Sequence, residues 1–266
     1  MENLLSVREV CCGYVTRSLG SFGRRIEKPV LHGINLEIAP GEIVGLVGES
    51  GCGKTTLGNC VLGLVDYSGD IIIDGLRRGT NRRDMARRVQ AVFQDPSASL
   101  NPAWKAGRIL EEPLRINRMG SGAERRRRVD EVLELVGLDP SYKNRGVHEL
   151  SVGQKQRICI GCALAPRPRL IIADEAVSAL DVSVGAQILN LFRELHQNLG
   201  LGMLFISHNL NLVYYLCDRI AVMKDGRIVE QGSAEEVYGN PRAPYTRALL
   251  EAVPAPPGQL GAATRG

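Results

Sequence analysis

A stretch of eight residues, Gly48 to Thr55, constrains the fold of this chain more than any other feature. Its sequence, GESGCGKT, fits the pattern G-x-x-x-x-G-K-[ST] of a phosphate-binding loop. The apolar run at 42–47 predicts a buried strand before the loop, and residues 56–64 predict a helix after it, although two glycines weaken that helix. A strand, a glycine-rich loop and a helix in this order predict an α/β fold that binds phosphates.

The residue types of this loop suit a polyanion. Glycine has no Cβ, so the backbone can approach phosphates closely, and the amide N–H groups at a helix N-terminus attract negative charge. Lys54 is expected to reach the β- and γ-phosphates of a nucleotide, and the Thr55 hydroxyl is expected to bind Mg²⁺. The alternative is a glycine-rich turn with a chance Lys-Thr pair, and the flanking strand and helix disfavour it.

Strands alternate with helices along most of the chain, which predicts a largely parallel sheet. Helices are predicted at 188–199 and 210–216, and strands at 5–10, 30–38, 69–75, 88–94, 170–174, 203–207 and around the Asp225-Gly226 turn. A helical block from about 97 to 160, with a helical pattern over 108–138, interrupts the alternation and predicts an inserted subdomain. Residues 18–28 are predicted to form a loop, and residues 254–266 a loose tail.

Composition excludes several classes of protein. The net charge of +4, from 33 basic and 29 acidic residues, is too small to indicate nucleic-acid binding, and the basic run at 125–128 lies among acidic residues, as on a solvated helix face. No apolar run approaches the roughly 20 residues of a membrane span. Residues 1–6 lack the apolar core of a signal peptide, so the chain is expected to stay in the cytoplasm.

The seven cysteines are scattered and odd in number, so no disulfide framework is predicted. Cys159 and Cys162 form a single C-x-x-C in a helical stretch, where buried free thiols are the expected state.

Other polar residues stand where chemistry at a phosphate would need them. Asp174 ends an apolar strand, which is expected to lie next to the strand of the phosphate-binding loop, so that its carboxylate supports Mg²⁺. Glu175 follows directly and could polarise a water in line with the γ-phosphate. Ser151 opens a helix, and two interpretations stay open: a second phosphate-binding helix end or an ordinary N-cap. Tyr14 is either a base-stacking aromatic or a rim aromatic.

The order of these motifs, with Gln94 after a strand, residues 178–181 and His208, resembles the ATP-binding subunit of ABC transporters from about residue 5 to residue 253. The resemblance implies that Tyr14 stacks on adenine and that phosphates and Mg²⁺ are held by Gly48, Ser50, Gly51, Gly53, Lys54, Thr55 and Thr56. It implies that Asp174 binds Mg²⁺ through water, that Gln94 contacts Mg²⁺ or the attacking water, that Glu175 is the general base and that His208 holds the γ-phosphate. It further implies roles across a dimer for Ser151, Gly153, Gln154 and Asp181.

The resemblance also implies a domain plan. The ATPase domain would span 1–253, with a catalytic core and an antiparallel β subdomain at 1–96 and 161–253, a helical subdomain at 97–160, and a flexible tail at 254–266. The core would be a P-loop α/β fold with a mostly parallel sheet.

Residues 92–102 and 240–250 are similar to the same segments of oligopeptide, dipeptide and nickel importers. This finer resemblance implies an ATPase at the cytoplasmic face of the inner membrane that drives import of peptides, or of nickel or another metal or metal chelate. The implied partners are a second, different ATPase subunit, two transmembrane permeases and an extracytoplasmic solute-binding protein, with no nucleic acid. The alternatives are a non-catalytic nucleotide-binding partner and a soluble ABC ATPase outside transport.

The chain departs from the family pattern at three places. Val152 replaces the first glycine of Leu-Ser-Gly-Gly-Gln, and Gly161-Cys162 replaces a common Ala-Arg. A cysteine cluster that many peptide importers carry near the C-terminus is absent, which argues against an iron–sulfur cluster. Because valine is branched and restricts its backbone, the ATP site that faces Val152 is hypothesised to be the slower of two.

Overall fold

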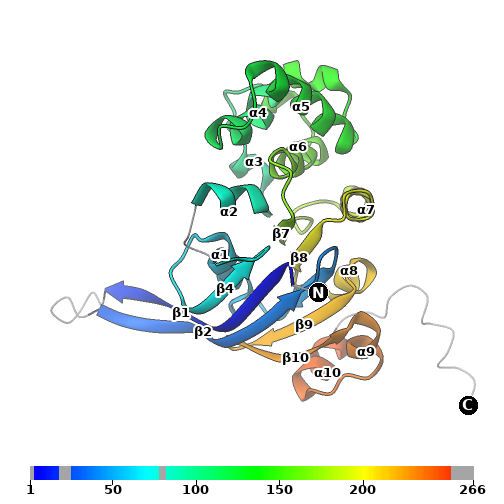
Figure 1. The fold of residues 1–266 in the computed structure, drawn as a ribbon. Helices are drawn as coiled ribbons and strands as arrows, with labels where there is room; N and C mark the ends of the chain where they lie inside the picture. The colour runs from blue at the N-terminus through cyan, green and yellow to red at the C-terminus, as the bar shows by residue number, and fades with distance from the viewer. Residues whose placement is uncertain (1–2, 18–24, 78–81, 253–266) are drawn as a thin grey trace, which may run out of the picture.

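The computed structural model describes residues 3–17, 25–77 and 82–252. Two β-sheets form the lower part of the molecule in Figure 1, and a group of helices, drawn in green, stands apart above them. This arrangement confirms an α/β fold with an antiparallel β subdomain and an inserted helical subdomain.

A six-stranded sheet carries the phosphate-binding loop. Its order is β10-β9-β3-β8-β7-β6, and all neighbouring strands are parallel except β10 against β9. The strands β3 and β8 are buried along their whole length, as expected for a sheet covered on both faces. The strand bounds are β3 (Ile43–Val47), β6 (Val89–Val92), β7 (Leu170–Asp174), β8 (Gly202–Ile206), β9 (Arg219–Lys224) and β10 (Arg227–Ser233).

Helices connect these strands and cover the sheet. The predicted helix after the phosphate-binding loop is α1, and the predicted helix at 210–216 is α8. The bounds are α1 (Lys54–Leu62), α2 (Arg82–Arg88), α7 (Val182–Leu199), α8 (Leu210–Leu216), α9 (Ala234–Gly239) and α10 (Pro244–Glu251).

A four-stranded antiparallel sheet, β2-β1-β4-β5, packs against the first sheet. Its strands are β1 (Leu5–Arg17), β2 (Arg25–Ile38), β4 (Ser68–Ile73) and β5 (Leu76–Arg77). The prediction of a loop at 18–28 is wrong for residues 25–28, because β1 and β2 continue as a long ladder to the pair Arg17 and Arg25. A ladder satisfies its backbone groups whatever the side chains are, so polar residues can extend it. Residues 18–24 lie outside the described part of the chain.

The helical subdomain contains α3 (Pro96–Ser99), α4 (Ala106–Ile116), α5 (Gly122–Leu135) and α6 (Val152–Leu164), with 3₁₀ turns at Pro140–Asn144 and Val147–Glu149. The helical pattern predicted over 108–138 is two helices. Arg118 and Gly120 have positive φ and turn the chain, and a capping box of Ser121 and Glu124 starts α5. The division expected at residue 160 falls inside α6.

Two further expectations, on the cysteines and on membrane spans, concern the described residues. All seven cysteines are free thiols. Within 3–17, 25–77 and 82–252, no helix has both the length and the apolar character needed to cross a membrane. The tail at 254–266 lies outside the described residues.

Candidate functional site

Three neighbouring strands end at one edge of the large sheet, and the predicted site residues gather there. The phosphate-binding loop follows β3, His208 follows β8, and Asp174 ends β7. The expectation that β7 lies next to β3 is wrong, because β8 lies between them. Helix α1 closes the gap: Thr55 in its first turn lies with its Oγ1 3.3 Å from Asp174 Oδ1. Side chains that are as far apart in the sequence as Thr55, Asp174 and His208 therefore belong to one site.

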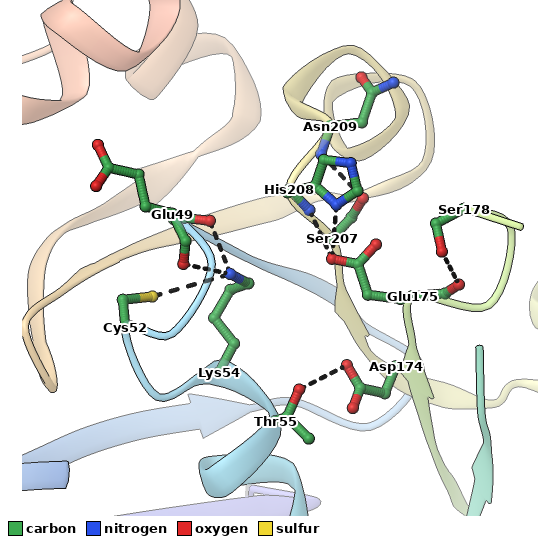
Figure 2. Close-up of polar contacts among 11 residues, drawn as sticks. Glu49, Cys52, Lys54, Thr55, Asp174, Glu175, Ser178, Ser207, His208 and Asn209 are labelled. Carbon is green, nitrogen blue, oxygen red and sulfur yellow. Dashed lines mark hydrogen bonds and ion pairs between the residues drawn. The ribbon is translucent and has the colours of Figure 1, made fainter. Parts of the chain in front are cut away.

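The loop holds Lys54 tightly. The Lys54 side chain is only 6% exposed, and its Nζ donates to the carbonyl oxygen of Gly48 at 2.7 Å. It also donates to the carbonyl oxygen of Glu49 at 2.8 Å (Figure 2). Gly48 has φ 153°, and a Cβ there would lie 2.1 Å from the Met223 carbonyl oxygen. Glycine is therefore required at this position, where the loop folds around the Lys54 ammonium group.

The Asp174 carboxylate and the Thr55 hydroxyl form an all-oxygen pair. Burial, and then the neighbouring charge of Glu175, raise the pKa of Asp174, while the hydrogen bond from Thr55 and the charge of Lys54 lower it in part. Oxygen ligands are those that Mg²⁺ prefers, and a bound cation would favour the ionised carboxylate against burial. These two residues therefore fit a magnesium ion.

Glu175 is held through one oxygen and free at the other. Its Oε1 accepts from the His208 backbone N–H at 3.1 Å and lies 2.8 Å from His208 Nδ1 (Figure 2). A carboxylate only accepts, so Nδ1 carries the proton and Nε2 can face a ligand. Glu175 Oε2 is buried and has no hydrogen-bond partner among the residues that the structure describes. The residue has φ 52°, a left-handed backbone that a non-glycine residue adopts at a cost and that is typical of functional sites.

Tyr14 lies beside the loop. Its side chain is 41% exposed, and its hydroxyl is 3.4 Å from the Thr56 hydroxyl. Ser50 and Gly51 are exposed at the top of the loop, whereas Gly53, with φ 108°, is buried at the start of α1. An exposed aromatic next to an anion-binding loop can stack on a base.

Gln94 is exposed two residues after β6. Because Val92 pairs with Ala173, Gln94 follows at the same sheet edge as Asp174. Its position is therefore compatible with the site, and its contact with Mg²⁺ or water stays a prediction.

The residues expected to act across a dimer cap helices in this chain. Ser151 and Gln154 form a reciprocal capping box at the start of α6, which confirms the N-cap interpretation of Ser151. Asp181 caps α7 by accepting from Val184 N–H at 2.9 Å. A Cβ at Gly153 would lie 2.8 Å from Val184 Cγ1, so the two helix starts are in close contact. Their roles toward a second subunit stay predictions.

Two residues that contact this region have no signal in the sequence. Tyr245 of α10 accepts a hydrogen bond at 3.1 Å from the backbone N–H of Glu49, 196 positions earlier. Gln156 of α6 is fully buried, and its Nε2 donates to the Ala176 carbonyl at 2.7 Å, next to Glu175. Neither contact follows from local spacing, because each joins elements that meet only in the folded chain.

Family models match two parts of the chain. Residues 31–178 match the ABC transporter model, and residues 229–265 match the C-terminal region of oligopeptide and dipeptide transporters. The second match includes the tail predicted from composition alone.

Named relatives are similar over nearly the whole chain. A putative peptide import ATP-binding protein of Brucella ovis is 50% identical over 258 residues, which cover 95% of this chain and 79% of that protein. The glutathione import ATP-binding protein GsiA of Salmonella choleraesuis is 46% identical over 259 residues, which cover 95% of this chain and 41% of GsiA.

Solved structures agree with the fold. CbiO1 of Clostridium perfringens, part of the ABC transporter complex CbiONQ, has a TM-score of 0.77 at 30% identity, covering 90% of this chain and 92% of CbiO1. The ATP-binding cassette MJ0796, a dimer in a post-hydrolysis state with ADP and Pi, has a TM-score of 0.72 at 30% identity, covering 86% and 98%. The chain therefore belongs to the ABC transporter family, as one of its ATP-binding, ATP-hydrolysing subunits.

Proposed function

We propose that this subunit hydrolyses MgATP at the cytoplasmic face of the inner membrane to power the import of peptides. The names of the relatives and the match of residues 229–265 to oligopeptide and dipeptide transporters support this cargo class. The proposed complex contains a second, different ATPase subunit, two transmembrane permeases and an extracytoplasmic solute-binding protein.

The proposed hydrolytic role rests on how the two carboxylate oxygens of Glu175 are bonded. One carboxylate oxygen is fixed by His208, and the other is buried with no hydrogen-bond partner in the described part of the chain. A water in line with a γ-phosphate would give that free oxygen a hydrogen bond, and Glu175 would accept its proton as the water attacks. His208, held by Glu175 through Nδ1, would direct Nε2 to the γ-phosphate oxygens, to which it donates as an imidazolium with both ring nitrogens protonated.

The other residues bind and orient the nucleotide. Lys54 leaves the carbonyl oxygens of the loop to reach the β- and γ-phosphates, and the first-turn amides of α1 contribute their dipole. Thr55 and Gln94 would hold Mg²⁺ directly, and Asp174 would hold it through water. When bound, the ion supplies positive charge to the phosphate oxygens. The helix start at Ser151, Gly153 and Gln154 would face the ATP held by the other ATPase subunit.

The proposal is tested on the assembled complex. We expect the tagged chain, expressed in its source cell, to copurify with two permeases and a second ATPase. In proteoliposomes, ATP hydrolysis should rise when the binding protein is added with a mixture of short peptides. Ni²⁺ added in place of peptide is the matched control for the other cargo expected from the sequence.

Several results would count against the proposal. If Ni²⁺ and not peptides stimulated ATP hydrolysis, the transported cargo would be nickel rather than peptides. Purification without any membrane protein would favour a soluble ABC ATPase. Full transport activity with Glu175→Gln in this subunit would make it a non-catalytic partner.

A further inference from the structure

The C-terminal helix α10 contacts the phosphate-binding loop through one side chain. The backbone N–H of Glu49 donates to the Tyr245 hydroxyl oxygen at 3.1 Å. Glu49 is the first residue after Gly48, at the point where the loop leaves β3. A residue from the region matched by the oligopeptide and dipeptide transporter model therefore contacts the ATP site.

The same peptide unit holds Lys54 at its other end. The carbonyl of Gly48 belongs to the Gly48–Glu49 peptide and accepts from Lys54 Nζ at 2.7 Å. In a trans peptide the C=O and N–H groups point in opposite directions. Tyr245 and Lys54 therefore hold one peptide plane from opposite sides. Gly48, with φ 153°, has no Cβ to restrict rotation of that plane.

Tyr245 is itself fixed in place. The Lys224 ammonium, at the end of β9, lies 4.9 Å from the centroid of its ring. The Glu230 carboxylate of β10 accepts from the backbone N–H groups of Arg242 at 2.7 Å and Ala243 at 2.9 Å, which anchors the start of α10. Burial and then the Glu49 charge raise the pKa of Tyr245, against the Glu49 amide hydrogen bond, so the phenol keeps its proton at neutral pH. The hydroxyl is thus a neutral, fixed acceptor for the loop.

We infer that Tyr245 is a positioning residue for ATP binding. Its hydroxyl orients the Gly48–Glu49 peptide, and through the Gly48 carbonyl it sets where Lys54 waits for the phosphates. Without the hydroxyl, the Glu49 N–H loses its acceptor and the glycine lets the peptide turn, so the loop must be ordered again at each binding event. The inference rests on the proposed role of Lys54 at the phosphates.

The test removes only the hydroxyl. Tyr245→Phe keeps the ring beneath Lys224, and Tyr238→Phe is the matched control, because its hydroxyl donates at 3.0 Å to Asn211 Oδ1, between α9 and α8. The dissociation constant for Mg²⁺ with AMP-PNP is measured on the purified full chain, and KM and kcat for ATP on the complex. We expect Tyr245→Phe to raise Kd and KM by about three- to tenfold, the effect of one hydrogen bond, with kcat within about twofold. Tyr238→Phe should change none of them.

Three outcomes would overturn the inference. The first two are an unchanged Kd of Tyr245→Phe for AMP-PNP and a lower Kd. The third is a fall in melting temperature larger than that of Tyr238→Phe, which would make Tyr245 a structural residue. Lys54→Ala serves as a reference in the same titration. If Lys54→Ala binds normally, the proposed function of the loop fails, whereas a defect in Lys54→Ala without one in Tyr245→Phe sinks only the present inference.

Discussion

The edge of the large sheet and the start of α6 carry the two groups of predicted site residues, and they differ in how those residues are bonded. At the sheet edge, side chains from separate elements bond to one another: Thr55 to Asp174, and His208 to Glu175. At the start of α6, Ser151 and Gln154 bond to each other within one turn. The first group brings side chains from separate elements together, as a reaction site needs, and the second is a capped helix end for which we propose a role toward a second subunit. The predictions below test this contrast, from the largest expected effect to the smallest.

The sharpest test at the sheet edge is Glu175→Gln. The amide cannot accept a proton from water, so we expect kcat of the complex to fall by about 10²–10⁴-fold while ATP still binds. Glu235→Gln, an exposed carboxylate on α9, is the control and should be silent. Turnover near the wild-type rate in Glu175→Gln would show that the base lies elsewhere.

Lys54→Ala should act on binding. The ammonium group donates to two loop carbonyls now and is expected to donate to phosphates when ATP is bound, an exchange worth about 1.5–3 kcal/mol for a charged donor. We expect ATP affinity to fall by about 10- to 100-fold, measured by calorimetry on the full chain. An unchanged affinity would remove Lys54 from the phosphate site.

A comparison of two N-cap residues, Ser121 of α5 and Ser151 of α6, distinguishes a structural role of Ser151 from a role in ATP turnover. Ser121→Ala and Ser151→Ala each break a capping box, at α5 and α6, and each should cost about 1 kcal/mol, or roughly 2–4 °C in melting temperature. Only Ser151→Ala should also reduce ATP turnover in the complex, because Ser151 is expected to face the partner's nucleotide. Equal turnover in the two variants would leave Ser151 as a cap alone.

The smallest effect is expected from Val152→Gly. The Val152 side chain is 50% exposed at the first position of α6, where it is expected to stand between this helix and the partner's phosphates. With Glu175→Gln blocking this subunit's own site, Val152→Gly should raise the remaining hydrolysis by up to a few fold. Lower hydrolysis in that background would show that valine is a fitted part of the interface.

Local patterns predicted the parts of the site that depend on neighbours in sequence. The glycine loop, the apolar strand before Asp174 and the strand before His208 are short-range signals, and each forms over the residues where it was expected. The insertion of β8 between β3 and β7 could not be predicted, because all three strands are equally apolar and nothing local fixes their order. Tyr245 was missed for the same reason, since its partner is 196 residues away.

The extents of the elements were predicted less well. The polar ends of β1 and β2 gave no apolar alternation, although the ladder continues to Arg17 and Arg25. The break after α4 depends on the backbone of Arg118, whose φ of 51° no residue-type rule indicates for arginine.

The contact of Gly153 with Val184 has a mechanical consequence. A methyl of Val184 fills the space that a Cβ of Gly153 would need, so the start of α6 contacts the start of α7 at this point. Asp181 holds the backbone N–H of that same Val184. A rotation of the helical subdomain must therefore either move Asp181 with it or separate the start of α6 from the start of α7. The positions of Gly153 and Asp181 are thus mechanically coupled through Val184.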